Sequence, residues 1–456
     1  MSTIPPVAEM TSQATRKMLL AEPVRAAPKG WSGTGLDQSL LMDLTGKYLL
    51  SRGRTPILEI AEALKLPAVV IDEVLQIMRQ DTLIEINRQG ITDAGIECRL
   101  TDNGRIRAHE ALQRNRYIGP APIPLDQFAS QVHAQAAAQP SVNDVILAQA
   151  FHDLVIPKDL ADRLGAAINS RRAVLMYGPA GSGKTFLAER LARLLPGTVA
   201  IPFAIAVGGE IIQMFDPLVH RPLLAPENSG AQVRTVLPRT DRRWITCHRP
   251  VVLTGGELTL DMLDLRFDAS TGFYQAPPHV KAMGGLFIVD DLGRQLVAPR
   301  DLMNRWIVPL ERGVDYLTTH SGLKFEIPFE LKVVFSTNYP PSKLADDAFL
   351  RRFGHKIHIG SISPRDYKRI FEQACLDQGV AFSNSAFEWL LVTKHARERR
   401  PLLAAYPQDL VGRICDIASY RRQAAQMTNE MLEQAWQTYF LADTDPDVEA
   451  NTFGTA

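Results

Sequence analysis

The strongest chemical signal in the sequence is the glycine-rich segment 178–185, which fits the pattern GxxxxGK[ST] at every fixed position. An apolar run at 173–177, typical of a buried strand, precedes it, and a helical stretch from Thr185 to Leu195 follows it. Because the backbone N–H groups of such a loop surround a phosphate, we expect ATP here, with Lys184 reaching its β- and γ-phosphates and Thr185 holding Mg²⁺. A chance glycine-rich turn is the alternative, and the flanking pattern disfavours it. The predicted cofactor-binding residues are Gly178, Pro179, Ala180, Gly181, Ser182, Gly183, Lys184 and Thr185.

A second apolar run, 285–289, ends in the acidic pair Asp290-Asp291. A carboxylate at the carboxyl end of a parallel strand faces the ligand crevice of the sheet. We expect Asp290 to bind Mg²⁺, through a water because Mg²⁺ keeps several waters, and Asp291 to polarise the attacking water. The alternative is that the pair only caps the next helix, which is compatible with metal binding.

A polar residue and three arginines complete the candidate site. Asn338 follows the buried-strand candidate 331–335 and could bind the γ-phosphate or the attacking water, although asparagine also suits a turn. Arg351 and Arg352 are adjacent on a short helix, where surface charge is the simpler interpretation. Arg413 lies in a late helix, and a solvated side chain is the alternative there.

The order of these motifs resembles that of the AAA+ ATPases over about residues 144–440. The resemblance implies an α/β P-loop core with a parallel sheet and a C-terminal helical lid. It gives Asn338 the role of sensor 1, Arg413 that of sensor 2, and Arg351 or Arg352 that of an arginine finger acting on the ATP of a neighbouring subunit. It implies a homo-oligomeric ring, most often a hexamer. Val155 and Ile156 stand where the family packs the adenine, and Asp291 stands where most relatives carry glutamate.

Two alternating segments resemble insertions of the MoxR-like branch of that family. One is a hairpin at 314–327 around a Ser-Gly turn, and the other is a small hairpin at 262–275. Such insertions usually line the ring pore or contact the client. Phe273 and Tyr274 are therefore candidate client contacts, with local packing as an equal alternative. The stretch 198–260 fits no pattern.

Residues 31–116 resemble a winged-helix domain. We expect helices at 37–50, 55–64 and 68–80, strands at 82–87 and 97–100 around a loop with Gly90 and Gly95, and a last helix from a Thr101 cap to Leu112. The second helix should begin with Thr55 as N-cap and Pro56 at its first position. The region holds 11 basic and 12 acidic residues, and the helix expected to read DNA begins with Asp72 and Glu73. Protein contact is therefore favoured over DNA binding.

The remaining segments define the predicted domain boundaries. We expect a mobile tail at 1–30, the winged-helix-like domain at 31–116, a linker at 117–143, the α/β nucleotide-binding domain at 144–360, the helical lid at 361–440 and an acidic tail at 441–456. The chain has 456 residues and a formal net charge of zero, which argues against a chain-wide polyanion binder. The sequence contains no apolar run of membrane-spanning length and no secretory signal, and its four cysteines are scattered. These features favour a cytoplasmic protein without membrane insertion.

Three functions remain open from the sequence. The first is a Mg²⁺-dependent AAA+ ATPase whose ring remodels or assembles a protein client in the manner of a chaperone. The second is a nucleic-acid-acting motor or transcriptional regulator that reads DNA through the winged helix. The third is a nucleotide switch without turnover, which the shorter Asp291 keeps open.

Overall fold

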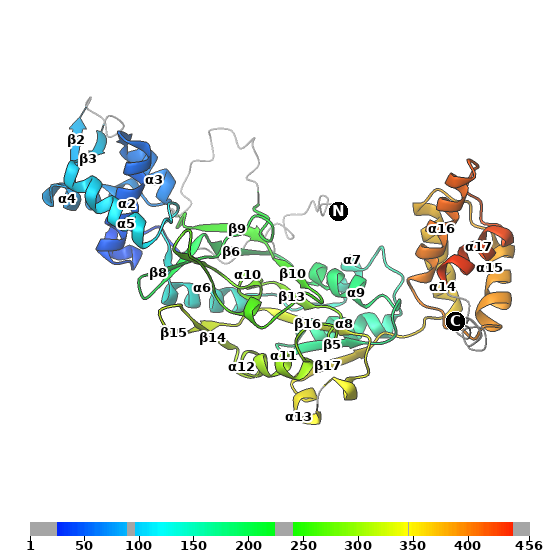
Figure 1. Ribbon diagram of the computed structural model, residues 1–456. Coiled ribbons are helices and arrows are strands. Elements are labelled where there is room, and N and C mark those ends of the chain that lie inside the picture. Colours follow the sequence, from blue (N-terminus) through cyan, green and yellow to red (C-terminus); the bar gives the residue numbers. More distant parts are fainter. Residues whose placement is uncertain (1–24, 89–95, 224–239, 345, 441–456) are drawn as a thin grey trace, which may run out of the picture.

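A five-stranded parallel sheet forms the centre of the molecule in the computed structural model, which describes residues 25–88, 96–223, 240–344 and 346–440 (Figure 1). Its spatial order is β10-β13-β16-β5-β17, so the first strand in the chain lies between the fourth and the fifth. In a parallel sheet, ligands bind beyond the carboxyl ends of the strands where the strand order reverses, which here is the end of β5. The strands are β5 (Ala173–Tyr177), β10 (Val251–Thr254), β13 (Leu286–Val289), β16 (Lys332–Thr337) and β17 (Phe353–His358).

Helices cover both faces of this sheet, as the apolar side chains of its strands require. On one face, α8, α9 and the turn η3 pack against the strands through Leu164, Ala188 and Leu191, respectively. On the other, Leu302 of α11 and Trp306, which lies between α11 and α12, are buried. This confirms the predicted α/β fold class with a parallel sheet. The helices are α7 (Asp144–Ala150), α8 (Lys158–Asn169), α9 (Lys184–Arg190), α11 (Pro299–Arg305), α12 (Ile307–Arg312) and α13 (Asp347–Leu350), with 3₁₀ turns η3 (Leu191–Leu194), η4 (Asp261–Leu263) and η5 (Pro341–Lys343).

A second, mixed sheet in the order β11-β12-β8-β7-β4 lies between the parallel sheet and the N-terminal region (Figure 1). Both predicted hairpins are present, β11 with β12 and β14 with β15. The stretch 198–260, which fits no pattern in the sequence, supplies β7 and β8 of this mixed sheet and β10 of the parallel sheet. It also supplies β6 and β9, which pair with each other in a separate two-stranded sheet. The bounds are β6 (Thr198–Pro202), β7 (Ala204–Val207), β8 (Glu210–Gln213), β9 (Trp244–His248), β11 (Arg266–Asp268), β12 (Phe273–Gln275), β14 (Val314–Thr318) and β15 (Lys324–Pro328), with α10 (Pro278–Lys281).

The segment 117–143, predicted as a linker that becomes partly helical, is packed into the fold. Its residues form β4 (Ile123–Pro124), which pairs with β7, and helix α6 (Leu125–Ala137). Ile123, Phe128 and Val132 are almost fully buried, the last two on the inner face of α6. The abundance of Ala and Gln concealed this narrow apolar stripe, which is enough to fix the helix to the second sheet.

The N-terminal region has the predicted element order of three helices, a β-hairpin and a closing helix. Thr101 caps the last helix by accepting a hydrogen bond from the N–H of Gly104. The prediction for Thr55 is wrong, because Thr55 pairs with Cys98 in a short strand and Pro56 is the N-cap. The loop with Gly90 and Gly95 lies outside the described residues. The bounds are η1 (Trp31–Thr34), α2 (Gln38–Arg52), β1 (Thr55–Pro56), α3 (Ile57–Leu64), α4 (Ala68–Gln80), β2 (Ile84–Arg88), β3 (Ile96–Leu100) and α5 (Asp102–Arg114).

This N-terminal region is fixed to the second sheet rather than tethered to it. The guanidinium of Arg243, 1% exposed, donates to the carbonyl oxygens of Thr34 and Pro122 at 3.1 and 3.2 Å and pairs with the buried Asp241. Ala26 pairs with Thr240, so the predicted mobile tail does not extend to residues 25–30. Residues 1–24 lie outside the described part of the chain, as does the predicted acidic tail.

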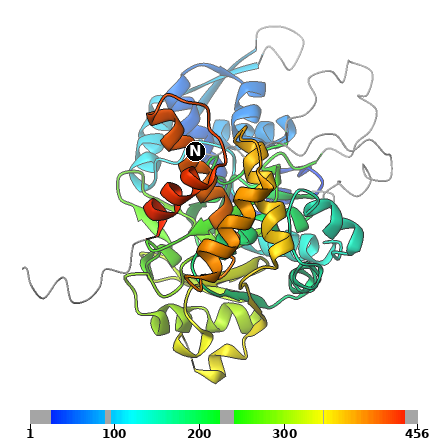
Figure 2. The same cartoon turned by 90° about the vertical axis from the view of Figure 1, so that its right-hand side faces the viewer.

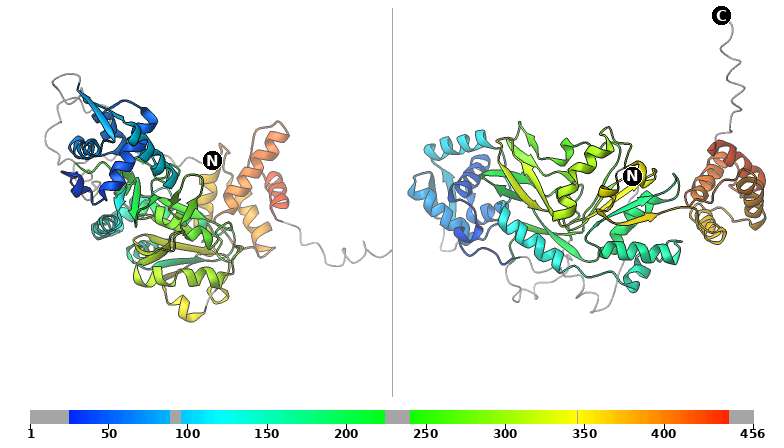
Figure 3. Two further views of the ribbon diagram at one scale, coloured as in Figure 1. Left: turned by 60° about the vertical axis from the view of Figure 1, so that its left-hand side comes forward. Right: turned by 90° about the horizontal axis from the view of Figure 1, so that it is seen from below.

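Four α-helices and one π-helical segment form a C-terminal helical domain with its own apolar core (Figures 1 and 2). Seen from below, the molecule is elongated, with this domain and the N-terminal region at opposite ends (Figure 3). The helices are α14 (Pro364–Asp377), α15 (Asn384–Trp389), the π-helix η6 (Leu390–Ala396), α16 (Tyr406–Tyr420) and α17 (Asn429–Tyr439). Within the described residues, no helix is both long and apolar enough to span a membrane.

Candidate nucleotide-binding site

The loop 178–185 connects β5 to α9 at the switch point of the parallel sheet. Gly178 has φ of +153°, and a Cβ there would lie 1.9 Å from the carbonyl oxygen of Ile359. Gly181 and Gly183 have φ of +80° and +92°, a region that favours glycine. The pattern therefore contains glycine where the backbone requires it, and the N-terminus of α9 faces the loop.

Lys184 lies folded into this loop. Its ammonium group donates to the carbonyl oxygens of Gly178 and Pro179 at 3.0 and 2.8 Å. Burial lowers the pKa of Lys184, and the nearby Asp291 and Asp290 carboxylates oppose that effect. A buried ammonium whose partners among the described residues are neutral oxygens, the two carbonyls and the Ser182 hydroxyl, is suited to bind an anion entering the loop.

Thr185 and Asp290 meet beneath the loop, as predicted for a metal site. The Thr185 hydroxyl donates to Oδ2 of Asp290 at 2.7 Å. Oδ1 of Asp290 is buried and has no hydrogen-bond partner among the described residues. A hydroxyl and a carboxylate with one oxygen unpartnered are oxygen donors of the kind that Mg²⁺ prefers, so the residues present fit this ion.

Asp291 and Asn338 also lie together, from the ends of the neighbouring strands β13 and β16. The amide of Asn338 donates to Oδ1 of Asp291 at 2.9 Å. Asp291 has φ of +48°, in the left-handed region that aspartate tolerates better than most residues. Arg294, which the sequence reasoning did not single out, lies 3.9 Å from Oδ2 of Asp291.

Gln295 is a further residue that the sequence reasoning missed. Its side chain is 8% exposed and joins the ends of two strands, because Nε2 donates to the carbonyl oxygens of Gly255, after β10, and Asp290, after β13. Its Oε1 accepts from the N–H of Gly293. These three bonds fix the loop that carries Asp291. No sequence pattern distinguishes this glutamine from others in polar loops, so the sequence could not have identified its role.

Arg351 and Arg352 lie at the opposite edge of the sheet from the phosphate loop. They follow α13 and precede Phe353, which pairs with Ala173 at the start of β5, whereas the loop follows the end of β5. Arg352 donates to Glu311 at 2.6 Å. Arg351 is exposed, and its side chain forms no hydrogen bond or ion pair with the described residues. The structure therefore does not bring either arginine to the phosphate loop of the same chain.

The C-terminal helical domain contacts the phosphate loop through residues 403–406. The N–H of Ala405 donates to the carbonyl oxygen of Gly181 at 3.0 Å. A Cβ on Gly181 would lie 3.5 Å from the Tyr406 ring, and one on Gly183 would lie 3.7 Å from Ala404. This segment begins α16, and the sequence reasoning gave it no role.

Arg413 lies two turns further along α16. Its guanidinium stacks 4.5 Å from the Tyr439 ring centroid and donates to the carbonyl oxygen of Asp409, toward the end of α16 that meets the phosphate loop. Val155 and Ile156 are half-buried before α8, and Ile156 packs against the core on that face of the sheet. Within the described residues, none of these three side chains forms a hydrogen bond to the loop.

Phe273 and Tyr274 do not form an exposed client contact. Tyr274 is 1% exposed, and its hydroxyl accepts from the N–H of His320. Phe273 is partly buried and packs edge-on against Tyr117 at 5.5 Å between ring centroids. Local packing, the alternative that the sequence left open, is what the structure shows.

Two family models match parts of the chain. The model described as magnesium chelatase, subunit ChlI, matches residues 151–227, which contain the phosphate loop. A domain of unknown function, DUF8689, matches residues 363–438, which form the C-terminal helical domain. No curated protein matches the chain.

Solved structures similar to this chain have low overall superposition scores. The Holliday junction branch migration motor RuvB of Thermotoga maritima is 15% identical, with 73% of this chain and 74% of that chain covered and a TM-score of 0.33. NtrX from Brucella abortus in complex with ADP is 13% identical, with 76% and 69% covered and a TM-score of 0.39.

Proposed function

We propose that the chain is an ATP hydrolase of the AAA+ type that requires Mg²⁺. The observation that carries the proposal is the pair formed by Thr185 and Asp290, with the unpartnered Oδ1 of Asp290 beneath a glycine loop that Lys184 closes. Each of these groups is one that a nucleotide triphosphate with its metal ion would use.

Each residue has a role that follows from its position. The loop N–H groups and Lys184 bind the phosphates, and Thr185 with Asp290 would hold Mg²⁺, which supplies charge neutralisation on the phosphate oxygens when bound. Asp291 accepts a proton from the attacking water, and Asn338 orients Asp291 through their 2.9 Å hydrogen bond. Val155, Ile156 and Arg413 would surround the nucleotide as the helical domain closes like a lid.

The proposal includes a homo-oligomeric ring, hexameric as in most AAA+ proteins. Arg351 and Arg352 lie at the sheet edge opposite the phosphate loop, so either could serve only a neighbouring subunit's nucleotide. An arginine supplied in trans neutralises charge on the transferred phosphoryl group and makes hydrolysis depend on assembly.

We further propose that the ring acts on a protein client in the manner of a MoxR-like chaperone, and that the N-terminal region is a winged-helix domain used for protein contact. Helix α4, which would read DNA, is partly covered by η1, because Glu73 accepts from the N–H of Trp31 at 2.7 Å. Asp72 near its start accepts from Gln76. The start of α4 is thus acidic and partly covered, and such a helix is poorly suited to contact the bases of DNA.

The alternative is a nucleic-acid-acting motor, favoured by the exposed arginines Arg105 and Arg114 on α5. It predicts that duplex DNA stimulates ATP turnover and that DNA binding weakens steeply with salt. Unchanged turnover over a range of duplex concentrations at low salt contradicts it.

The deciding experiment measures ATP turnover of the purified chain beside Lys184→Ala and Asp291→Asn. Lys184→Ala should lose both nucleotide binding and turnover. Asp291→Asn should keep ATP binding and lose turnover by at least about 100-fold, since asparagine tolerates the left-handed backbone but accepts no proton. Normal turnover by Lys184→Ala would refute the site assignment. ATP-loaded Asp291→Asn, recovered from its host with a protein in near-ring stoichiometry, would identify the client, whereas nuclease-sensitive nucleic acid alone would support the alternative.

A further inference from the structure

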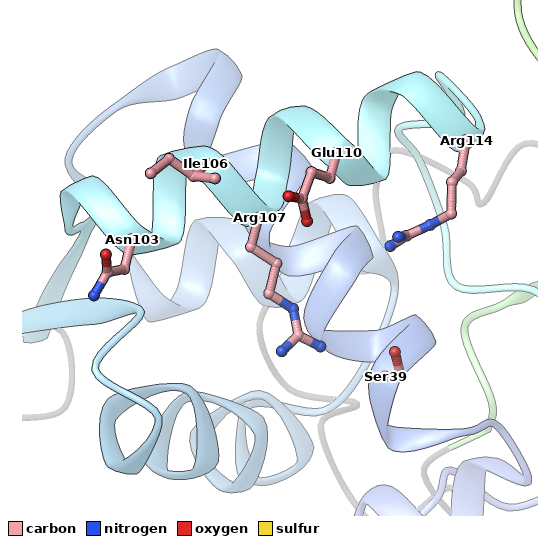
Figure 4. Close-up of a pocket in the computed structure, with 6 residues that line it drawn as sticks. All are labelled: Ser39, Asn103, Ile106, Arg107, Glu110 and Arg114. Carbon is pink, nitrogen blue, oxygen red and sulfur yellow. The ribbon is translucent and has the colours of Figure 1, made fainter.

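A groove of about 330 Å³ lies between α2 and α5 on the N-terminal region, far from the phosphate loop (Figure 4). The side chains of α5 that border it project from one side of that helix, and α2 contributes the facing wall. Its lining residues are Ser39, Asn103, Ile106, Arg107, Glu110 and Arg114. No residue of this groove takes part in the proposed nucleotide chemistry.

Cations outnumber carboxylates around this groove. The carboxylate of Asp43 pairs with both Arg107, at 3.6 Å, and Arg114, and its Oδ1 has no hydrogen-bond partner among the described residues. Lys47, 1% exposed, lies beside the same pair and donates to Asn115 Oδ1 at 2.7 Å. The groove and the residues directly behind it thus hold three cations, Arg107, Arg114 and Lys47, and two carboxylates, Asp43 and Glu110. Arg105 and Arg116 are also exposed, as is the carboxylate of Asp102.

An apolar side chain stands among these charges. Ile106 is 61% exposed and lies between Arg105 and Arg107 in the sequence. A lone exposed isoleucine is ordinary, but one that lines a cationic groove offers an apolar contact to a ligand that also carries negative charge.

The chain itself contains a segment with the complementary pattern. Residues 441–456 carry four carboxylates and no lysine or arginine. Within them, Val448 stands between Asp447 and Glu449, the reverse-charge counterpart of Ile106 between two arginines. The acidic residues beside Val448 would attract the arginines beside Ile106, and the two apolar side chains could then contact each other.

We propose that residues 441–456 of a second copy of this chain dock in the groove between α2 and α5. A second copy is the donor because α17, which precedes the segment, and α5 lie at opposite ends of the molecule (Figures 1 and 3). The 16 residues reach at most about 55 Å when fully extended. The docked segment joins the helical domain of one subunit to the N-terminal region of another, and this contact does not depend on ATP hydrolysis.

A binding measurement tests the chemistry of the groove. The probe is a fluorescent peptide of residues 441–456, titrated into the full chain and followed by anisotropy at 50 and 300 mM salt. We expect saturable binding that weakens at high salt, and at least tenfold weaker binding to Ile106→Asp and to Arg107→Gln/Arg114→Gln. Arg79→Glu, an exposed arginine of α4 outside the groove, is the matched control and should bind as the parent does. Because Ile106 is exposed, Ile106→Asp should fold even if the double variant does not.

Equal binding by the parent chain and Ile106→Asp would overturn the proposal. So would groove-dependent binding of a 20-base-pair DNA duplex that the peptide does not displace, since the groove would then serve phosphates.

A disulfide experiment tests the second copy. In a Cys415→Ser background, which removes the one partly exposed cysteine of the described residues, chains with Ile106→Cys are mixed with chains carrying Val448→Cys and oxidised. A disulfide-linked heterodimer supports docking between copies, and Arg79→Cys in place of Ile106→Cys should give none. The same bond formed only inside a single doubly substituted chain, or no bond in either arrangement, contradicts it. Because this readout needs no nucleotide, its failure is distinct from a failure of the proposed ATPase.

Discussion

The hydroxyl of Thr185 and the carboxylate of Asp290 lie 2.7 Å apart, although 105 residues separate them in the chain. One comes from the start of α9 and the other from the end of β13, so the parallel sheet has to be in register for them to meet. The hydrogen bond uses only one carboxylate oxygen, and Oδ1 of Asp290 remains buried without a partner in the described chain. An unsatisfied buried carboxylate oxygen is costly, and a bound cation would remove that cost.

Replacement of Asp290 should therefore change the metal requirement. We expect Asp290→Asn to raise the Mg²⁺ concentration for half-maximal ATP turnover at least tenfold, because a neutral amide attracts the ion less than a carboxylate does. The free energy of unfolding without Mg²⁺ should fall by no more than about 1 kcal/mol, since the amide can still accept from Thr185. Turnover as a function of Mg²⁺ concentration checks this, and an unchanged half-saturation point would remove Asp290 from the metal site.

Gln295 should act on turnover through the position of Asp291. Gln295→Glu places carboxylate oxygens against the carbonyl oxygens of Gly255 and Asp290, so we expect turnover to fall by about tenfold or more. The Kd for ATP should change little, because the phosphate loop is not touched. Gln295→Met keeps the side-chain volume but loses all three hydrogen bonds. Its turnover should lie between that of the parent chain and that of Gln295→Glu. A fall in ATP affinity with unchanged turnover at saturation would show that Gln295 does not position Asp291.

The two adjacent arginines should differ in mixed assemblies. Arg352 is held by Glu311 and lies over the Phe349 ring at 5.6 Å, whereas Arg351 is exposed. We expect Arg351→Ala to lower turnover by roughly 10³-fold with ATP binding intact, and Arg352→Ala chiefly to lower stability. Arg351→Ala chains, with their intact loops, should regain activity when mixed with Lys184→Ala chains that supply Arg351. No gain on mixing would contradict action in trans.

The parts that the sequence predicted well are those where short motifs demand a particular backbone. The glycines at 178, 181 and 183 all adopt positive φ, and the apolar runs before them and before Asp290 form buried strands on either side of β16. Since the carboxyl ends of parallel strands meet at one edge, a strand-ending Asp290 and Asn338 could be expected near the loop.

The parts that the sequence missed depend on tertiary contacts. Gln295 and Ala405 act through backbone carbonyl oxygens, for which no side-chain pattern exists. β10 is an edge strand whose Val251 and Leu253 remain partly exposed. Its sequence therefore lacked the pattern of a strand buried on both faces. In α6, a narrow stripe around Phe128 was hidden among alanines and glutamines. In each case the structure depends on a distant segment that the residue or element contacts, and not on the local composition.

Arg243 should control whether the N-terminal region stays fixed to the second sheet. Its removal in Arg243→Met leaves Asp241, 4% exposed, as an uncompensated buried charge, which costs about 3–5 kcal/mol. We expect a lower urea midpoint and faster proteolytic cleavage near residue 120, where Pro122 loses its bond. Asp241→Asn/Arg243→Met removes the lone charge and should recover part of the stability while cleavage stays fast. Arg242→Met, at an exposed neighbour paired with Glu62, is the matched control and should change either measurement little. If Arg243→Met unfolds at the parent's urea midpoint, the N-terminal region is fixed by its apolar contacts with Ala204 and Ile211 instead.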